Sequence, residues 1–297
     1  MQTFTVYLGS AGAARDIFKQ QACLLGDILA REDKHLIYGG MNAGLMGLLA
    51  QHALRGGGAV TGIIPRKLQD SERIMEGLTR TLLVEELCDR KRLMFEECDV
   101  VVCLPGGFGT LDETLEALYW GSLKMHSKPI VLVNIDGYWD KMVAFLNSLP
   151  DYDDRYCIIV DDVEGILPAL EAWDKLPPIQ TPAHLPHFED EISRDTLQAI
   201  VIDKPTLENA YFVTCAMGLK QLDKHQRPIG LINAGGVYDD FITWAKNAQA
   251  EHFITAKCLT LFDSAPDEDQ LRALLKHQSR PDIDLHAEKW GKAISGE

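Results

Sequence analysis

The stretch from Leu104 to Glu113 reads Leu-Pro-Gly-Gly-Phe-Gly-Thr-Leu-Asp-Glu and follows a short, wholly apolar run at 100–103. The apolar run predicts a buried strand of a parallel sheet. Apolar residues then recur at helical spacing from 111 to 119, which predicts a helix that begins at Thr110 and carries Glu113 in its first turn. A strand, a glycine turn and a helix N-terminus together present backbone N–H groups to an anion. The stretch therefore predicts a phosphate site.

Two further glycine turns follow predicted strands. Gly9 and Ser10 come after the strand at 4–8, and a second turn containing Gly39, Gly40 and Gly44 comes after the strand at 35–38. Glycines often serve only a sharp strand-to-helix turn, but three such turns at successive strand ends favour a ligand that carries phosphate. The Walker sequence is absent, and so is the dinucleotide fingerprint after the first strand, which argues against hydride transfer.

Strands alternate with helices through the first 170 or so residues. This order predicts an α/β fold, a Rossmann-like doubly wound parallel sheet with helices on both faces. The prolines at 177, 178, 182 and 186 indicate a linker. We therefore expect a nucleotide-binding catalytic domain at 1–176, a proline-rich linker at 177–190 and a smaller accessory α/β domain at 191–297.

The last third of the chain resembles an earlier part of it. A shift of 99 residues superimposes, without a gap, Leu123, His126, Pro129, Ile130, Leu132, Asn134, Gly137 and Asp140 on Leu222, His225, Pro228, Ile229, Leu231, Asn233, Gly236 and Asp239. Two more residues of shift place Cys157 on Cys258. Convergence on a generic β-α-β pattern is the alternative to an internal duplication. Because the copy has lost the glycines and carries Phe212 in place of Glu113, we expect a degenerate half-repeat with a structural or regulatory role.

The composition is that of an ordinary globular protein with an acidic surface. The formal net charge of −15 argues against nucleic acid or an anionic membrane as a partner, although local arginines still allow a small anionic ligand. The seven cysteines are scattered without metal-ligand spacing, which favours reduced thiols in a cytoplasmic protein. A strand begins almost at once, and no apolar run reaches the ~18 residues of a membrane span, so we expect neither a signal peptide nor a membrane anchor.

The motif at 105–113, Arg90-Lys91-Arg92-Leu93-Met94 upstream and the glycines from 39 to 47 together resemble the LOG family over roughly 3–173. That family consists of cytokinin riboside 5′-monophosphate phosphoribohydrolases, often mislabelled lysine decarboxylases. The resemblance implies a homodimer with its active site near the subunit interface, which cleaves the N-glycosidic bond of a nucleoside 5′-monophosphate. We expect no cofactor and no metal. The presumed substrate is AMP or an N6-modified AMP, as for an AMP nucleosidase. The implied catalytic pair is Arg90 and Glu113, and the implied phosphate loop contains Gly106, Gly107, Gly109 and Thr110.

The chemistry of glycosidic cleavage agrees with these residue types. An oxocarbenium-like transition state needs nearby negative charge and an oriented water, which Glu113 can supply, while the Arg90 guanidinium suits phosphate or ribose oxygens. The alternatives are a carboxylate that only stabilises a helix end and an arginine on a solvated face. Ser10 is either a cap or a ligand contact, and Met94 belongs either to the core or to a wall against the base.

Two other functions compete with hydrolysis. A non-catalytic carrier of nucleotide or molybdenum cofactor would use a similar glycine loop, but it would not need both Arg90 and Glu113. A decarboxylase that uses pyridoxal phosphate needs a buried lysine for the Schiff base. None of the candidate lysines lies in an evident setting for that role; they are Lys67, Lys91, Lys124 and Lys128.

Overall fold

The computed structural model describes residues 2–66, 74–194, 198–279 and 281–283. Within them, seven parallel strands form one sheet in the order β4-β3-β2-β1-β5-β6-β7. Their bounds, in sheet order, are Arg80–Val84, Val60–Pro65, His35–Tyr38, Thr3–Tyr7, Val100–Cys103, Ile130–Val133 and Cys157–Val160. The predicted parallel sheet is confirmed. Lys67, which the sequence offered as a candidate lysine, lies outside the described residues.

The direction of winding changes between β1 and β5. From β1 the chain adds β2, β3 and β4 on one side, then returns to place β5 beside β1 and continues outward through β6 and β7. All four residues of β5 are buried, as its apolar sequence predicts. In such sheets the crevice beyond the carboxyl ends of the strands at the switch point is the usual ligand site.

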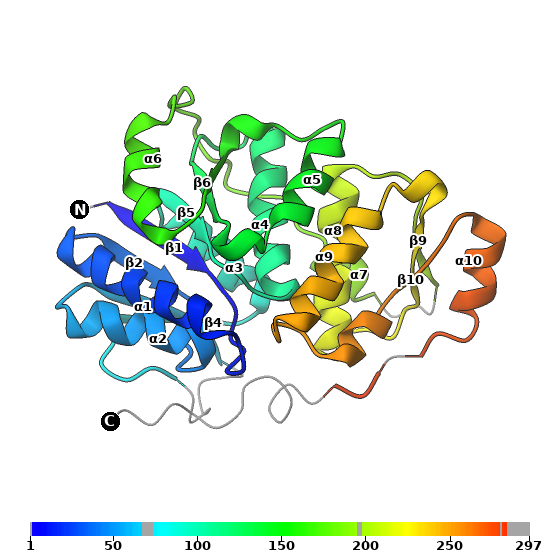
Figure 1. Ribbon diagram of the computed structural model, residues 1–297, viewed down its shortest axis with the longest axis horizontal. Helices are drawn as coiled ribbons and strands as arrows, with labels where there is room; N and C mark the ends of the chain where they lie inside the picture. The colour runs from blue at the N-terminus through cyan, green and yellow to red at the C-terminus, as the bar shows by residue number, and fades with distance from the viewer. Residues whose placement is uncertain (1, 67–73, 195–197, 280, 284–297) are drawn as a thin grey trace.

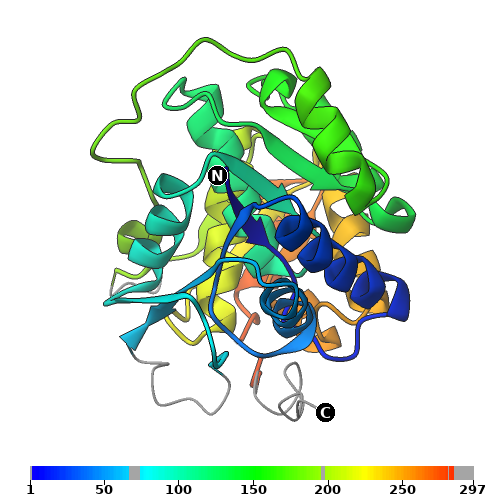
Figure 2. The same ribbon diagram turned by 90° about the vertical axis from the view of Figure 1, so that its left-hand side faces the viewer.

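Helices cover both faces of this sheet. Right-handed crossovers place α1, α2 and α6 on one face and α3, α4 and α5 on the other (Figures 1 and 2). Their bounds are Asp16–Arg31, Gly44–Arg55 and Ile166–Ala172 for the first face and Leu87–Glu96, Phe108–Ser122 and Asp140–Ser148 for the second. None of the described helices combines the length and apolar composition that spanning a bilayer requires.

The start of α4 corrects the sequence-based boundary. The helix begins at Phe108 with Gly107 as its N-cap, two residues before the predicted start at Thr110. Thr110 therefore lies in the first turn, and Glu113 lies in the second turn rather than the first. Because a helix dipole acts on charges mainly within the first turn, a capping role does not account for Glu113.

Elements of the last third of the chain repeat those of an earlier part. Helix α8 (Leu207–Gln221) has the bounds of α4 shifted by 99 residues, and β9 (Ile229–Ile232) has those of β6. Equivalent side chains make equivalent hydrogen bonds. Nε2 of His126 lies 2.9 Å from the Ala117 carbonyl oxygen, and Nε2 of His225 lies 2.8 Å from that of Ala216. These shared polar contacts are not required by helical or strand periodicity, which argues against convergence.

Strand β9 forms a small parallel sheet with β8 (Ile200–Ile202) and β10 (Asp263–Ala265), in the order β10-β9-β8. The remaining helices of the second copy are α9 (Asp239–Ala250) and α10 (Glu268–Leu275). The predicted match of Cys157 to Cys258 is wrong. Cys157 begins β7, whereas Cys258 lies in a 3-10 helix at Ala256–Thr260. The strand that pairs with β9, as β7 pairs with β6, is β10, and its residues match those of β7 only with a longer shift.

The repeat packs against the first copy with two-fold character, α8 on α4 and α9 on α5 (Figure 1). Trp139 stacks on Trp244 with centroids 5.8 Å apart, and Phe145 packs on Tyr238 at 5.9 Å. Under the 99-residue shift, Tyr238 is the counterpart of Trp139 and Trp244 is the counterpart of Phe145. The same two positions therefore meet twice with their roles exchanged, which is the definition of an isologous contact.

A residue on the axis of this contact meets its own counterpart. Nζ of Lys141 lies 2.9 Å from Oδ1 of Asp240, and these positions are 99 residues apart. The apolar side chains of the two copies form one continuous buried core. The second copy therefore occupies the place that a second subunit would take in a two-fold dimer.

Replacing Trp244 by alanine tests this interface. Loss of this fully buried indole, and of its stacking contact with Trp139, should lower the free energy of unfolding by about 3–5 kcal/mol. A double-mutant cycle with Trp139 should give a coupling of about 0.5–1.5 kcal/mol. Lys141→Ala, which breaks an exposed ion pair in the same interface, should cost at most about 1 kcal/mol. Urea unfolding measures all three, and equal effects of the Trp244 and Lys141 variants would contradict the assignment.

Candidate active site

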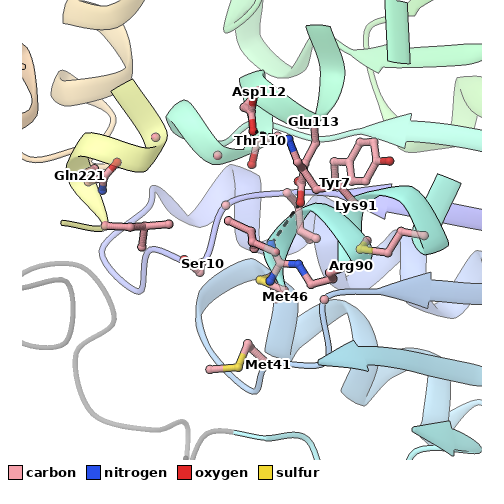
Figure 3. Close-up of a pocket in the computed structure, with 18 of the residues that line it drawn as sticks. Tyr7, Ser10, Met41, Met46, Arg90, Lys91, Thr110, Asp112, Glu113 and Gln221 are labelled. Atoms are coloured by element: carbon pink, nitrogen blue, oxygen red, sulfur yellow. Dashed lines mark hydrogen bonds and ion pairs between the residues drawn. The ribbon is translucent and has the colours of Figure 1, made fainter. Parts of the chain in front are cut away.

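A pocket of about 230 Å³ lies where the carboxyl ends of β1, β2 and β5 meet the first turns of α4 (Figure 3). Its position is the switch point of the sheet, as the three glycine turns predict. Lining residues come from the ends of β1 and β2, from α2, α3 and α4, from α7 (Glu189–Ile192) and, in the second copy, from α8. Those used below are Gly9, Ser10, Gly39, Met41, Met46, Leu87, Arg90, Lys91, Met94, Gly109, Thr110, Asp112, Glu113, Glu189, Cys215, Gly218, Leu219, Gln221 and Leu222.

Arg90 and Glu113 meet inside this pocket. Nη2 of Arg90, on α3, donates a hydrogen bond to Oε1 of Glu113, on α4, at 3.3 Å. Their side chains are only 18% and 12% exposed, which places the ion pair in a setting of weak solvent screening. Burial raises the pKa of Glu113 above its ordinary value, and the positive charge of Arg90 opposes that rise.

Two buried polar atoms at the pocket have neither a hydrogen-bond nor an ion-pair partner among the described residues. They are Nε of Arg90 and Oδ1 of Asp112. Buried polar atoms in folded proteins almost always have a partner, since leaving one unpaired costs about 1–3 kcal/mol. Because both residues line the pocket, the unpaired donor of Arg90 is directly suited to a bound oxygen atom.

The glycines of the three turns divide into two groups. Gly9, Gly39 and Gly109 line the pocket, together with Ser10, Thr110 and Met94. A Cβ at Gly109 would meet nothing within 4 Å, so the backbone there is open to a ligand. Gly40, Gly44, Gly106 and Gly107 do not line the pocket.

Close packing explains the second group. A Cβ at Gly106 would lie 2.2 Å from Oγ1 of Thr110, and one at Gly44 would lie 2.5 Å from the Ser10 backbone. Gly40 and Gly44 also have positive φ, at 77° and 51°, which disfavours any side chain. These glycines shape the turns that hold the pocket and do not face it.

Lys91 is buried beside the pocket among three carboxylates. Its Nζ lies 3.0 Å from Asp112, 3.2 Å from Glu116 and 2.6 Å from Glu189. Desolvation disfavours the charged amine, but the three carboxylates prevail and its pKa lies above the ordinary value. Burial raises the pKa of Glu116 to about 8 and that of Asp112 to about 6, against the attraction of Lys91.

The sequence-based reading missed several of these residues. A basic run at 90–92 is typical of a solvated helix face, yet Lys91 is only 2% exposed. The expectation of a structural or regulatory role for the second copy also missed its part in the pocket. Its α8 supplies four of the lining residues, Cys215, Gly218, Leu219 and Gln221, and Leu222 follows at the C-cap of that helix. The glycine at 218 is a signal in the sequence that could have pointed there.

The fold and the site define a class. This is an α/β protein with a Rossmann-like sheet, a ligand pocket at its switch point and a buried arginine–glutamate pair beside a helix N-terminus. The chain belongs to the LOG family of cytokinin riboside 5′-monophosphate phosphoribohydrolases. It is 36% identical over 146 residues to the LOG2 enzyme of Arabidopsis thaliana, a match that covers 49% of this chain and 68% of that protein.

Other comparisons agree with this membership. The LOG5 protein of Arabidopsis thaliana is 38% identical over 146 residues, and a probable member from Oryza sativa subsp. japonica, LOGL1, is 39% identical over 143. These matches cover 49% and 48% of this chain, and this chain spans 64% of the length of each of the two relatives. The model of a family described as possible lysine decarboxylase matches residues 46–170.

Solved structures with a similar fold include the molybdenum cofactor binding protein of Rippkaea orientalis. It is 23% identical, with a TM-score of 0.48, and the match covers 58% of this chain and 96% of that one. The molybdenum cofactor carrier protein of Chlamydomonas reinhardtii is 21% identical, with a TM-score of 0.48, and the match covers 58% and 98%.

The decarboxylase description does not fit the residues at the site. Lys91 corrects our expectation, because it is a buried lysine at the pocket. A Schiff base nevertheless requires an unprotonated amine, and the carboxylates of Asp112 and Glu189 hold Lys91 in its charged form. Among the described residues, no three histidine, cysteine or acidic side chains are grouped so that they could hold a metal ion.

The buried carboxyl of Glu116 predicts a pH dependence of stability. The folded state keeps this proton up to about pH 8, whereas the unfolded chain loses it near 4.5, so stability falls as the pH rises through that window. Glu116→Gln should flatten the decline by about 1 kcal/mol per pH unit. Urea unfolding between pH 5 and 8.5 measures it, with Glu171→Gln, at an exposed position, as the control. Parallel curves for wild type and Glu116→Gln would contradict the assignment.

Proposed function

We propose that this protein hydrolyses the N-glycosidic bond of a purine nucleoside 5′-monophosphate, releasing the free base and ribose 5-phosphate. The substrate would be AMP or an N6-modified AMP. The observation that carries the proposal is the buried Arg90–Glu113 pair beside the N-terminus of α4. The names of the LOG relatives, phosphoribohydrolases of cytokinin riboside 5′-monophosphate, support the same reaction class.

The phosphate would bind at the start of α4. The first N–H groups of a helix have no partner within it, and the positive end of the helix dipole attracts an anion. Gly109 and Thr110 present that turn to the pocket, while Gly9 and Ser10 approach from the end of β1. This local site explains how a chain with a net charge of −15 can bind a phosphate ester.

The ribose would then lie between Arg90 and Glu113. The carboxylate of Glu113 would stabilise the positive charge that develops on the ribose as the bond breaks, and it would orient the attacking water. Arg90 keeps Glu113 charged and positioned, and its unpaired Nε would donate to a substrate oxygen. The fixed geometry means that neither group needs to reorganise during the reaction.

The base would occupy the end of the pocket formed by β2, α2 and α3. Four apolar side chains line this end: Met41, Met46, Leu87 and Met94. Thioethers are polarisable and adapt to flat aromatic rings, which suits a purine and leaves space for an apolar substituent to be accommodated. Gly39 allows this close arrangement, since a Cβ there would lie 2.8 Å from Cε of Met46.

Purified protein incubated with AMP, GMP, CMP and isopentenyladenosine monophosphate should release free base from the purine nucleotides. Glu113→Gln should lower the rate at least about 100-fold because it removes the negative charge from the transition state, while nucleotide affinity should change little. Arg90→Lys should also lower it, because a lysine cannot reproduce the planar fork. Chromatography of the base measures release, and calorimetry measures binding.

Glu96→Gln, at an exposed position on α3, is the matched control and should keep full activity. Release of no base from any nucleotide by protein with a normal unfolding transition would rule the reaction out. Mass analysis of ligand that co-purifies with native protein provides an independent test, and molybdopterin in that fraction would favour the carrier function instead.

A further inference from the structure

Helices α4 and α8 pack in opposite directions with a definite register. Tyr211 on α8 donates a hydrogen bond from its hydroxyl to Glu116. Four residues back along α4, Asp112 lies close enough to the Cys215 thiol for that thiol to lower the pKa of the carboxyl. Tyr211 is the counterpart of Asp112 in the second copy, and Cys215 is the counterpart of Glu116. The two contacts are therefore one contact formed twice, as in an isologous dimer.

The same antiparallel register, continued along the two helices in both directions, brings one residue of α4 level with one residue of α8 at each end of the pair. At one end, Gly109 on α4 comes level with Gly218 on α8, and both line the pocket. At the other end, Tyr119 lies close enough to Glu208 for that carboxylate to raise the pKa of the phenol beyond the effect of burial. Glu208 is the counterpart of Gly109, and Tyr119 is the counterpart of Gly218.

The two ends are thus related by the repeat but differ in content. A Cβ at either Gly109 or Gly218 would meet nothing within 4 Å, so that end is open. Tyr119 and Glu208 put two large, neighbouring side chains at the related end. The duplicated fold therefore has two equivalent positions along α4 and α8, of which one forms part of a pocket and the other is filled.

Gly218 has no structural reason to lack a side chain. It lies inside α8, where glycine costs roughly 0.5–1 kcal/mol relative to alanine. Positions where packing excludes a side chain show close neighbours, as Gly106 does, but Gly218 shows none. Space for a ligand explains it.

We propose that the second copy forms the outer wall of the phosphate end of this pocket, a role that rests on the proposed function. Gly218 leaves room for the 5′-phosphate, and the side-chain amide of Gln221 donates a hydrogen bond to it. One turn beyond Gly218, the same register places Gln221 level with the glycine turn at 106, and it lines the pocket across from Arg90 and Glu113 (Figure 3).

One chain then holds a complete site and its own second half. The faces of α4 and α5 that would meet a partner in a two-fold dimer are covered by α8 and α9. The homodimer that the family resemblance implies would need another face. Each chain binds one nucleotide, because the position related to the open end is occupied by Tyr119 and Glu208.

The closing experiment measures AMP and adenosine binding by calorimetry in the full-length protein. Wild type should bind about one AMP per chain. Gly218→Leu should weaken AMP binding at least about tenfold, since overpacking costs 1–3 kcal/mol, and should change adenosine binding much less. Its unfolding midpoint should equal or exceed that of wild type, because leucine favours helix and the added Cβ meets no neighbour. Loss of binding with stability retained is not expected of a purely structural glycine.

Tyr119→Leu is the matched control, because it places leucine at the position related to Gly218 by the repeat. It should leave AMP affinity unchanged whatever it does to stability. Gln221→Glu provides a second variant, since a negative charge beside the phosphate should weaken AMP binding about tenfold or more and leave adenosine binding unchanged.

The outcomes separate the two proposals. Three results would contradict the proposed role of the second copy while leaving the reaction intact. They are unchanged AMP affinity in both the Gly218 and Gln221 variants, equal losses of affinity for AMP and adenosine, and binding of two nucleotides per chain. Wild-type protein that binds AMP in this pattern but releases no base would overturn the reaction alone. Wild-type protein that binds no nucleotide would overturn both.

Discussion

The ion pair between Lys91 and Asp112 organises the site. Burying an ammonium group is costly, and it is tolerated because Asp112, Glu116 and Glu189 surround it. The contact joins α3 to α4 at 3.0 Å, and the residue before Lys91 and the residue after Asp112 form the Arg90–Glu113 pair at 3.3 Å. The Lys91–Asp112 pair thus holds α3 and α4 at the spacing at which Arg90 and Glu113 face the pocket. Positioning of a polar site by a rigid neighbour is what catalysis by fixed charges requires.

The second copy completes this arrangement. It kept the features that build the fold, such as His225 and its hydrogen bond to the Ala216 carbonyl oxygen, and it lost the glycine turn. Tyr211, the counterpart of Asp112, now donates a hydrogen bond to Glu116, and Cys215, the counterpart of Glu116, lies beside Asp112. Positions that are equivalent under the repeat, Asp112 with Tyr211 and Glu116 with Cys215, therefore carry different side chains that contact one another across the two copies. A contact of this kind stabilises only one arrangement of the two copies, which explains why they share a continuous core.

The sequence predicted the elements that periodicity controls and missed those that depend on contacts between distant segments. The strand at 100–103 and the pocket position follow from apolar runs and from the rule for parallel sheets. Burial of Lys91 could not be predicted, because its partner Glu189 lies 98 residues away in the segment expected to be a linker. The early start of α4 depends on Gly107, which packs against Phe253 and Ile254 of the second copy.

That packing also changes what the glycines of the motif signify. Loss of the glycines from the second copy suggests that they serve function, since a turn required by the fold would need them in both copies. Gly106 and Gly107 weaken this argument, because packing alone excludes a side chain at each: a Cβ at Gly106 would meet Thr110, and one at Gly107 would meet Ile254 of the second copy. Gly109 is different: a Cβ there meets nothing, and the second copy carries Glu208 instead. The functional argument therefore rests on the glycine that packing does not explain, and the same reasoning selects Gly218 on the opposite wall.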